Sequence, residues 1–309
     1  MTLRRFIRGV LWTLLCLVLL AGSLVGGLWL YFHPSAQRTN AVSYGQRGAR
    51  SLDLDVIKPA KPNGLGVLLL TSGGWKSGHS GSFPQWMATP LIRHGYTVFV
   101  IYHVSQPDAT VMEIIEDMHR AVRFVRNHAK EYGVDPRRLG VTGGSAGGHL
   151  SLMLATRGGP GPSDAPDPVD RESSAVQTVA IFYPVTDLLN LGNSTENLHD
   201  GGPPKSFRRS FGPDATNTAV WKVIGHDSSP IYYITTNMPP TLIYHGSADT
   251  LVPLDQSERF VAKALEIGRT VKLVVHPGGM HGWWSMVFDI GRFANWFDEH
   301  LPKESAMGR

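Results

Sequence analysis

The chain has 309 residues with a net charge of +4, and 42% of them are hydrophobic, which is enough for a large folded core. Its 34 glycines and 21 prolines are too few for a low-complexity or disordered chain. A single cysteine excludes an internal disulfide and therefore a small disulfide-stabilised scaffold.

The excess of basic residues lies at the N-terminus. Residues 1–8 contain Arg4, Arg5 and Arg8 and no acidic residue, so the other 26 of the 29 basic residues nearly balance the 25 acidic ones. A nucleic-acid-binding protein would carry a basic surface on its folded part. We therefore expect no nucleic-acid partner.

An uncharged apolar run follows at residues 9–32 and is long enough to cross a hydrocarbon layer of about 30 Å as a helix. Arginines before the run predict a single-pass membrane anchor, with residues 1–8 in the cytoplasm and the rest of the chain as a periplasmic or extracellular domain. The alternative is a signal peptide cleaved near residues 21–23 (Ala-Gly-Ser), which would release a secreted protein. The apolar run continues beyond these residues, which favours the uncleaved anchor.

Strand-like and helix-like patterns alternate along the rest of the chain. We expect a tether at residues 33–50, one domain at 51–302 and a C-terminal tail at 303–309. Expected strands cover 66–70, 97–102, 138–142, 178–183, 241–244 and 271–275, and apolar residues at helical spacing occupy 111–125, 255–268 and 287–301. Strands that are apolar throughout and separated by helices predict an α/β fold, with a mostly parallel central sheet covered by helices on both faces.

Two stretches of this domain carry more specific expectations. The helix near residue 255 should begin with a capping box formed by Asp255 and Glu258. Residues 191–230 are polar and interrupted by Gly and Pro, so we expect either a small cap over the functional site or a long connection.

A candidate nucleophile lies in the sequence Gly143-Gly144-Ser145-Ala146-Gly147, a G-x-S-x-G motif. It falls between an expected strand and a helical pattern, which is the strand–turn–helix context that this motif requires. A nucleophile on such a turn has a strained backbone, and glycines two residues to either side remove Cβ atoms that would collide with it. We predict that Ser145 is the nucleophile.

A serine hydroxyl needs a base to remove its proton, and the base needs an acid that holds its tautomer. Asp249 and His281 each lie just beyond an expected strand, in the order acid and then histidine. The carboxyl ends of parallel strands meet at the same edge of a sheet, so these side chains are expected beside Ser145.

Other residues compete for these two roles. His276 is the nearest rival base, but it lies at the strand end itself. Asp187 and Asp255 are rival acids, and Asp255 is better explained as a helix cap.

The reaction also needs an oxyanion hole of backbone N–H groups, one of them from the residue after the nucleophile, here Ala146. The other donors usually come from a Gly-rich loop after an early strand. Thr71-Ser72-Gly73-Gly74-Trp75 follows the first expected strand of the domain and fits that place, with an ordinary turn as the alternative.

The stretch from residue 52 to residue 301 resembles α/β-hydrolase-fold esterases of the hormone-sensitive-lipase-like and acetyl/feruloyl esterase (BD-FAE-like) type. The resemblance rests on Gly74-Trp75, on residues 135–141, on residues 143–149, on His245, Gly246, Asp249, Val252 and Pro253, and on His281-Gly282. These motifs are specific for the fold and the triad and much less so for the substrate.

The resemblance implies that Ser145 attacks an ester carbonyl, that His281 takes and returns the proton, and that Asp249 orients His281. The oxyanion donors that it implies are the N–H groups of Gly73, Gly74 and Ala146. It implies a carboxylesterase-type serine hydrolase, an esterase or deacetylase, that cleaves small acyl esters through an acyl-enzyme without a metal or cofactor. An acylated carbohydrate is one candidate substrate.

Two departures from the family pattern stand out. Thr71-Ser72 replaces the His-Gly that precedes the two glycines in relatives, which affects the support of the oxyanion loop and hence rate and acyl selectivity. Residues 102–108 read Tyr-His-Val-Ser-Gln-Pro-Asp where relatives often carry Tyr-Arg-Leu-Ala-Pro-Glu, and this change concerns a structural anchor.

Aromatic residues near the site are candidates for substrate binding. Trp75, Trp283 and Trp284 would stack on a sugar or wall a small acyl pocket. The alternative for Trp283 and Trp284 is packing of the last helix on the sheet.

Two other functions stay open. A serine peptidase of the prolyl-oligopeptidase type shares the triad order, although the short segment between the anchor and the first strand leaves no room for a propeller. A catalytically silent α/β-hydrolase used for binding is the third hypothesis.

Overall fold

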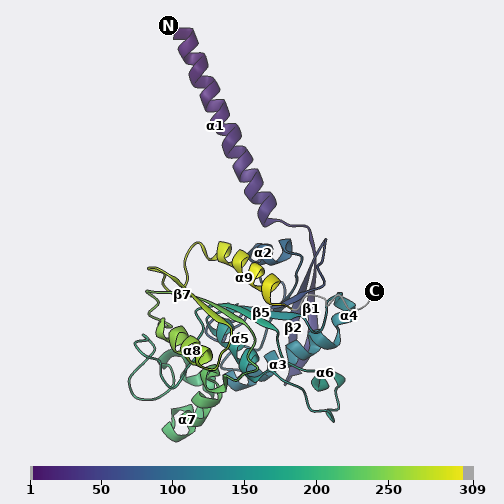
Figure 1. Ribbon diagram of the computed structural model, residues 1–309, viewed down its shortest axis with the longest axis vertical. Coiled ribbons are helices and arrows are strands. Elements are labelled where there is room, and N and C mark those ends of the chain that lie inside the picture. The colour runs from purple at the N-terminus through teal and green to yellow at the C-terminus, as the bar shows by residue number, and fades with distance from the viewer. Residues whose placement is uncertain (1–2, 302–309) are drawn as a thin grey trace.

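A long helix, α1 (Leu3–Phe32), stands apart from a layered α/β domain in the computed structural model, which describes residues 3–301 (Figure 1). The expected C-terminal tail at 303–309 lies outside the described residues. Arg4–Phe32 is long and apolar enough to cross a membrane, a property that an N-terminal signal sequence shares, and its helix is not buried against the domain.

Eight strands form one mixed sheet in the order β1-β2-β4-β3-β5-β6-β7-β8. The strands are β1 (Ala36–Arg47), β2 (Arg50–Pro59), β3 (Gly66–Leu70), β4 (Thr97–Ile101), β5 (Leu139–Gly144), β6 (Thr178–Phe182), β7 (Thr241–Gly246) and β8 (Val271–His276). From β4 to β8 the neighbours are parallel, and β1 and β2 form an antiparallel edge. Strands β4 and β6 are buried throughout, as their apolar sequences predicted.

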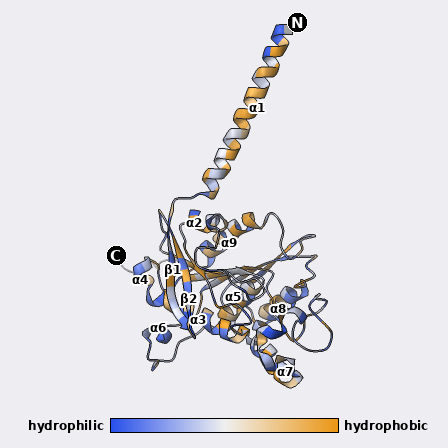
Figure 2. Ribbon diagram, turned by 180° about the vertical axis from the view of Figure 1, so that it is seen from behind, coloured by the Kyte–Doolittle hydropathy of each residue, from blue (hydrophilic) through white to orange (hydrophobic). Residues whose placement is uncertain are grey.

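Helices cover both faces of this sheet (Figures 1 and 2). They are α2 (Thr89–Arg93), α3 (Val111–Asn127), α4 (Ala129–Tyr132), α5 (Ala146–Arg157), α6 (Pro168–Arg171), α7 (Thr218–Asp227), α8 (Asp255–Glu266) and α9 (Met286–His300), with the short 3-10 helices η1 (Gln85–Ala88), η2 (Lys205–Phe211), η3 (Pro213–Thr216) and η4 (Pro230–Tyr233). One core joins α3, α5 and α8 to the sheet, and a second joins α2 and α9 to its other face. The expected α/β arrangement, covered on both faces, is confirmed.

The connection between α1 and the sheet is much shorter than the expected tether at residues 33–50. Strand β1 already begins at Ala36 and pairs with β2 as far as the turn at Gly48, so only residues 33–35 link helix to sheet. Most side chains of β1 are exposed or only partly buried, because this strand lies at the edge of the sheet. An edge strand of this kind lacks the alternation of apolar and polar residues from which a strand is predicted.

The capping box expected at Asp255 and Glu258 is not formed. Helix α8 begins at Asp255 itself, and Leu254 before it makes no side-chain capping bond. The Asp255 carboxylate instead accepts a hydrogen bond from Arg259, one turn later, at 3.1 Å. A carboxylate in the first turn still stabilises the helix through its dipole.

Replacing Phe297 by Ala should destabilise the domain by about 3–5 kcal/mol, because this α9 side chain is fully buried. Its ring fills the space beside Gly140 of β5, where a Cβ atom would come within 3.1 Å of it. Urea unfolding of the full-length protein in detergent measures the loss. The matched control is Phe288→Ala on the same helix, where the ring is 55% exposed and the expected change is below about 0.5 kcal/mol. Equal changes in the two variants would contradict the packing.

Candidate active site

Three side chains from the ends of three parallel strands meet at one edge of the sheet. Ser145 follows β5, Asp249 follows β7 and His281 follows β8. The His281 Nε2 atom lies 2.9 Å from Ser145 Oγ, and its Nδ1 atom lies 2.7 Å from Asp249 Oδ2. The structure thus brings together the three residues that the sequence singled out, at hydrogen-bonding distance and in the order that nucleophilic catalysis requires.

The backbone around Ser145 explains why its hydroxyl projects from the turn. Ser145 has φ of 56° and ψ of −121°, a conformation that L-residues rarely adopt. The turn packs so closely that a Cβ atom at Gly147 would lie 2.4 Å from the Leu70 carbonyl oxygen. A Cβ atom at Gly143 would lie 2.6 Å from the Gly147 carbonyl group. Only glycine fits at these two positions.

Asp249 is held in its ionised form by several donors. Its Oδ1 atom accepts the backbone N–H groups of Leu251 and Val252 at 3.0 and 2.9 Å. Burial by itself would raise the pKa of Asp249, but contacts with His245 and His281 and the Val252 N–H outweigh it and hold that pKa well below its usual value. The carboxylate therefore stays charged and fixes the proton of His281 on Nδ1.

Two further residues, Tyr183 and His245, lie beside the predicted triad. Tyr183 was not singled out in the sequence, and His245 belongs to the family motif but had no role assigned to it. The ring of Tyr183, directly after β6, lies 4.4 Å from the ring of His281, and burial together with the charge of Asp249 raises the pKa of Tyr183 to about 12. His245 is fully buried and its Nε2 atom lies 3.5 Å from Asp249 Oδ2. Both could have been found in the sequence from their positions, because each is an aromatic or histidine residue at the end of an expected strand.

The loop after β3 lies against the nucleophile turn, because the Ser72 carbonyl accepts the Gly147 N–H at 3.0 Å. Its glycines differ in their hydrogen bonds. The Gly73 N–H donates to the Lys76 carbonyl at 2.9 Å and closes a tight turn. No hydrogen bond from the N–H groups of Gly74 or Ala146 is found among residues 3–301, and both residues border the cavity beside Ser145. The geometry favours Gly74 and Ala146 over Gly73 as oxyanion donors.

The two departures from the family pattern contact each other. His103 Nδ1 lies 2.8 Å from the Val104 carbonyl, which can only accept, so Nδ1 carries the proton. His103 Nε2 then accepts the hydroxyl of Ser72 at 3.0 Å. Burial lowers the pKa of His103 to about 4 and keeps this pair neutral. In this chain a serine–histidine pair supports the loop after β3, which carries the predicted oxyanion donors.

A small cavity of about 60 Å³ opens beside Ser145. Its walls are mostly apolar and come from the oxyanion loop, the loop after β6, residues 191–207 and the loop that carries Asp249. The lining residues are Gly74, Trp75, Ser145, Ala146, Val185, Leu188, Leu191, Ser194, Glu196, Pro204, Phe207, Leu251, Val252, Pro253 and Gln256. The first part of the 191–230 segment thus lies over the cavity.

Trp75 is one of these walls and is almost completely buried. Its indole Nε1–H donates to His149 Nδ1 at 3.2 Å, and its ring packs edge-on against Phe207 at 5.3 Å between centroids. The His149 Nε2 atom lies 2.6 Å from the Ser228 carbonyl. Trp75 is therefore a fixed part of the cavity.

Trp283 lies on the opposite side of the nucleophile turn, where it lines a second and wider cavity. Its Nε1–H donates to Asp289 at 2.8 Å, and its ring stacks on His276 at 4.8 Å, so the rival base His276 is engaged away from Ser145. Trp284 is 89% exposed.

Among the described residues, no group of three or more His, Cys, Asp or Glu side chains could hold a metal ion.

Residues 53–264 match the model of the BD-FAE family. The chain belongs to the BD-FAE family. Esterase LipQ of Mycobacterium tuberculosis is 31% identical over 261 residues, which cover 80% of this chain and 57% of LipQ. The probable isoprenylcysteine alpha-carbonyl methylesterase ICMEL1 of Arabidopsis thaliana is 24% identical over 266 residues, which cover 85% of this chain and 54% of that relative. The chain spans little more than half the length of these curated relatives.

Solved structures share the fold of this BD-FAE family member. An acetyl ester-xyloside bifunctional hydrolase from Caldicellulosiruptor lactoaceticus has a TM-score of 0.68 at 25% identity, over 86% of this chain and 97% of that chain. A truncated carbohydrate esterase from gut microbiota has a TM-score of 0.66 at 23% identity, over 86% and 99% of the two chains. The α/β-hydrolase fold expected from the sequence is confirmed.

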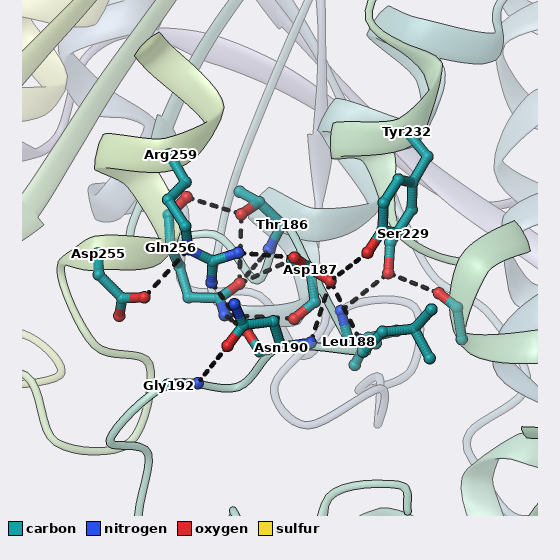
Figure 3. Close-up of polar contacts among 12 residues, drawn as sticks. Thr186, Asp187, Leu188, Asn190, Gly192, Ser229, Tyr232, Asp255, Gln256 and Arg259 are labelled. Carbon is teal, nitrogen blue, oxygen red and sulfur yellow. Dashed lines mark hydrogen bonds and ion pairs between the residues drawn. The ribbon is translucent and has the colours of Figure 1, made fainter. Parts of the chain in front are cut away.

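A polar network ties the loop after β6 to the first turns of α8 (Figure 3). Gln256 Oε1 accepts the backbone N–H groups of Thr186 and Asp187, each at 2.9 Å. The Asp187 carboxylate accepts from Arg259 at 2.6 Å and from the Tyr232 hydroxyl at 3.0 Å. Because α8 follows the loop that carries the predicted catalytic acid, this network fixes the cavity wall relative to that acid.

The same network accounts for both rival acids. Asp187 and Asp255 each bind the Arg259 guanidinium, at 2.6 and 3.1 Å (Figure 3). Neither carboxylate is a hydrogen-bond partner of His281, whose Nδ1 atom faces Asp249.

Protonation of His149 should destabilise the protein in acid, because burial lowers the pKa of His149 to about 4. The unfolded chain takes up this proton near pH 6.5, so the contribution to stability is complete above about pH 6.5 and is lost as the pH falls towards 4. Between pH 7 and pH 5, His149→Gln should therefore lose about 2 kcal/mol less unfolding free energy than the native chain. Urea unfolding at both pH values measures this, and an identical pH dependence in the two proteins would contradict it.

Proposed function

We propose that the protein is a serine carboxylic-ester hydrolase in which Ser145 is the nucleophile, His281 the general base and acid, and Asp249 the residue that orients His281. The observation that carries the proposal is the continuous chain of hydrogen bonds among these side chains, at the border of a mostly apolar cavity. Membership of the BD-FAE family, together with relatives that are named esterases, supports the reaction class.

The proposed reaction proceeds through an acyl-enzyme, and the distances within the triad support its proton transfers. His281 Nε2, at 2.9 Å, accepts the Ser145 hydroxyl proton as Oγ attacks the ester carbonyl. The negative charge of Asp249 stabilises the resulting imidazolium, which then protonates the leaving alcohol. Water attacks the acyl-enzyme with His281 again as base, and the carboxylic acid leaves.

The oxyanion of each tetrahedral intermediate would be stabilised by the N–H groups of Gly74 and Ala146. Each such donor contributes about 10²- to 10³-fold to kcat in comparable sites. Gly73 would join them only if its hydrogen bond to the Lys76 carbonyl opened. Its role here is to hold the turn that presents Gly74.

The two cavities suggest which part of the ester goes where. The cavity of about 60 Å³ beside Ser145 suits a short acyl group such as acetyl. The alcohol would extend towards the wider cavity and Trp283. Similarity to an acetyl ester-xyloside hydrolase makes an acylated carbohydrate one candidate for such an ester.

We also propose that α1 is a single-pass anchor with a cytoplasmic N-terminus and a periplasmic or extracellular catalytic domain. Its support is the length of the apolar segment and the three arginines before it. The competing interpretation is a signal sequence that is removed on export.

Ser145→Ala should abolish labelling by a fluorophosphonate probe and lower kcat for p-nitrophenyl acetate by roughly 10⁴- to 10⁶-fold. The matched control is Ser173→Ala, remote from the predicted triad, which should keep both properties. If the probe does not label Ser145 in the folded native protein, the proposed serine hydrolase activity is refuted. Faster cleavage of an aminoacyl-nitroanilide than of the ester would instead indicate a peptidase.

Phe207→Ala should shift the acyl preference towards longer chains, because this ring closes the small cavity next to Trp75. The ratio of kcat/KM for p-nitrophenyl octanoate to that for the acetate should rise about tenfold. Val223→Ala on α7, at a side chain that is 61% exposed, should leave the ratio unchanged. An unchanged ratio in Phe207→Ala would place the acyl group elsewhere.

A further inference from the structure

The end of α1 is fastened to the catalytic domain. The Arg93 side chain donates to the Tyr31 carbonyl at 2.8 Å and to the Leu30 carbonyl at 2.5 Å. The Phe32 ring packs edge-on against Trp86 at 6.1 Å between centroids. Only residues 33–35 separate α1 from β1, and three residues reach about 12 Å at most. A membrane that holds α1 must therefore lie close to this side of the domain.

Large apolar side chains gather on that side. Helices α2 and α9 lie on the face of the domain nearest α1 in both views (Figures 1 and 2). We call four residues from η1 and from residues 284–288, which lead into α9, the apolar rim: Trp86, Met87, Trp284 and Phe288, which are 47%, 37%, 89% and 55% exposed. Exposed tryptophans beside a membrane-spanning helix are typical of the bilayer interface.

The wider cavity leads from the apolar rim to the catalytic edge of the sheet. Its lining includes Trp86, Met87 and Trp284 of the apolar rim, and also Tyr183 and Gly144, which precedes Ser145. The Tyr183 ring in turn contacts the ring of the proposed general base at 4.4 Å. With about 670 Å³ and mostly apolar walls, this cavity has room for a long hydrocarbon group.

Basic side chains accompany this surface. Lys76 is exposed and lines the cavity. Arg292, 66% exposed, follows Phe288 by one turn of α9. Cations next to exposed tryptophans suit contact with anionic lipid headgroups.

We propose that the apolar rim rests on the bilayer that α1 spans, and that the wider cavity draws the ester from this bilayer. The substrate class is a short-chain acyl ester of a lipophilic alcohol, with the alcohol in the wider cavity and the acyl group in the small one. Water cleaves the acyl C–O bond, so a short carboxylic acid leaves to the aqueous phase and the alcohol returns to the membrane. The inference rests on the proposed esterase and on the retention of α1.

Docking can be measured without any activity. Full-length protein with Cys16→Ser is reconstituted into phosphatidylcholine–phosphatidylglycerol vesicles and labelled with an environment-sensitive fluorophore at Phe288→Cys or at Val223→Cys. Val223 is 61% exposed on α7, on the side of the domain away from α1 (Figure 1). Blue-shifted emission that doxyl-labelled lipids quench at position 288 alone supports docking. Equal quenching at both positions overturns it. So does a measured mass of the chain that shows that the α1 segment has been removed.

The substrate class is tested in the same vesicles with embedded hexadecyl acetate, beside p-nitrophenyl acetate in solution. Phe288→Glu should lower acetate release from hexadecyl acetate at least fivefold and change p-nitrophenyl acetate hydrolysis less than twofold. Val223→Glu should change neither. An equal loss on both esters, or no cleavage of hexadecyl acetate by an active native protein, overturns the proposal. A native protein that is inactive on both esters refutes the esterase itself, which leaves the docking measurement standing.

Discussion

The close approach between the turn after β5 and the end of β3 is the constraint on which the candidate site depends. A Cβ atom at Gly147 would lie 2.4 Å from the Leu70 carbonyl oxygen, and the Gly147 N–H donates to the Ser72 carbonyl at 3.0 Å. This contact presses the turn into the conformation that exposes Ser145. It also brings Ala146 beside the loop after β3, so one packing contact positions the proposed nucleophile and a proposed oxyanion donor together.

The buried charge that faces the predicted base belongs to Asp249. The Asp249 carboxylate is ionised because backbone and imidazole donors surround it, whereas burial keeps His103 and His149 neutral. Both histidines support neighbouring residues. His103 accepts a hydrogen bond from Ser72, and His149 accepts one from Trp75 in the cavity wall. The Asp249 carboxylate lies 2.7 Å from His281 Nδ1 and is fully buried, so solvent screens its effect on the predicted base only weakly.

The cavities on the two sides of Ser145 differ in shape, and this asymmetry supports the proposed link between the reaction and the membrane. Residues 191–207 and the network around Asp187 and Gln256 close a small cavity on one side. On the other side α9 and η1 leave a wide apolar cavity that opens beside the end of α1. A short acyl group and a long lipophilic alcohol would be sorted by these dimensions alone.

Local patterns were enough to predict the parallel sheet, the strand–turn–helix at Ser145 and the strand-end positions of Asp249 and His281, because apolar runs, glycines and strand ends can be recognised in short segments. Contacts between residues far apart in the chain followed only from the folded structure. An exposed edge strand took the place of a tether, the Lys76 carbonyl engaged the Gly73 N–H, and Arg259 bound both rival acids. Ser72 and His103, each of which departs from the family pattern in its own segment, form a hydrogen bond that supports the loop after β3. Such pairings follow from distances in the folded chain, which no local pattern encodes.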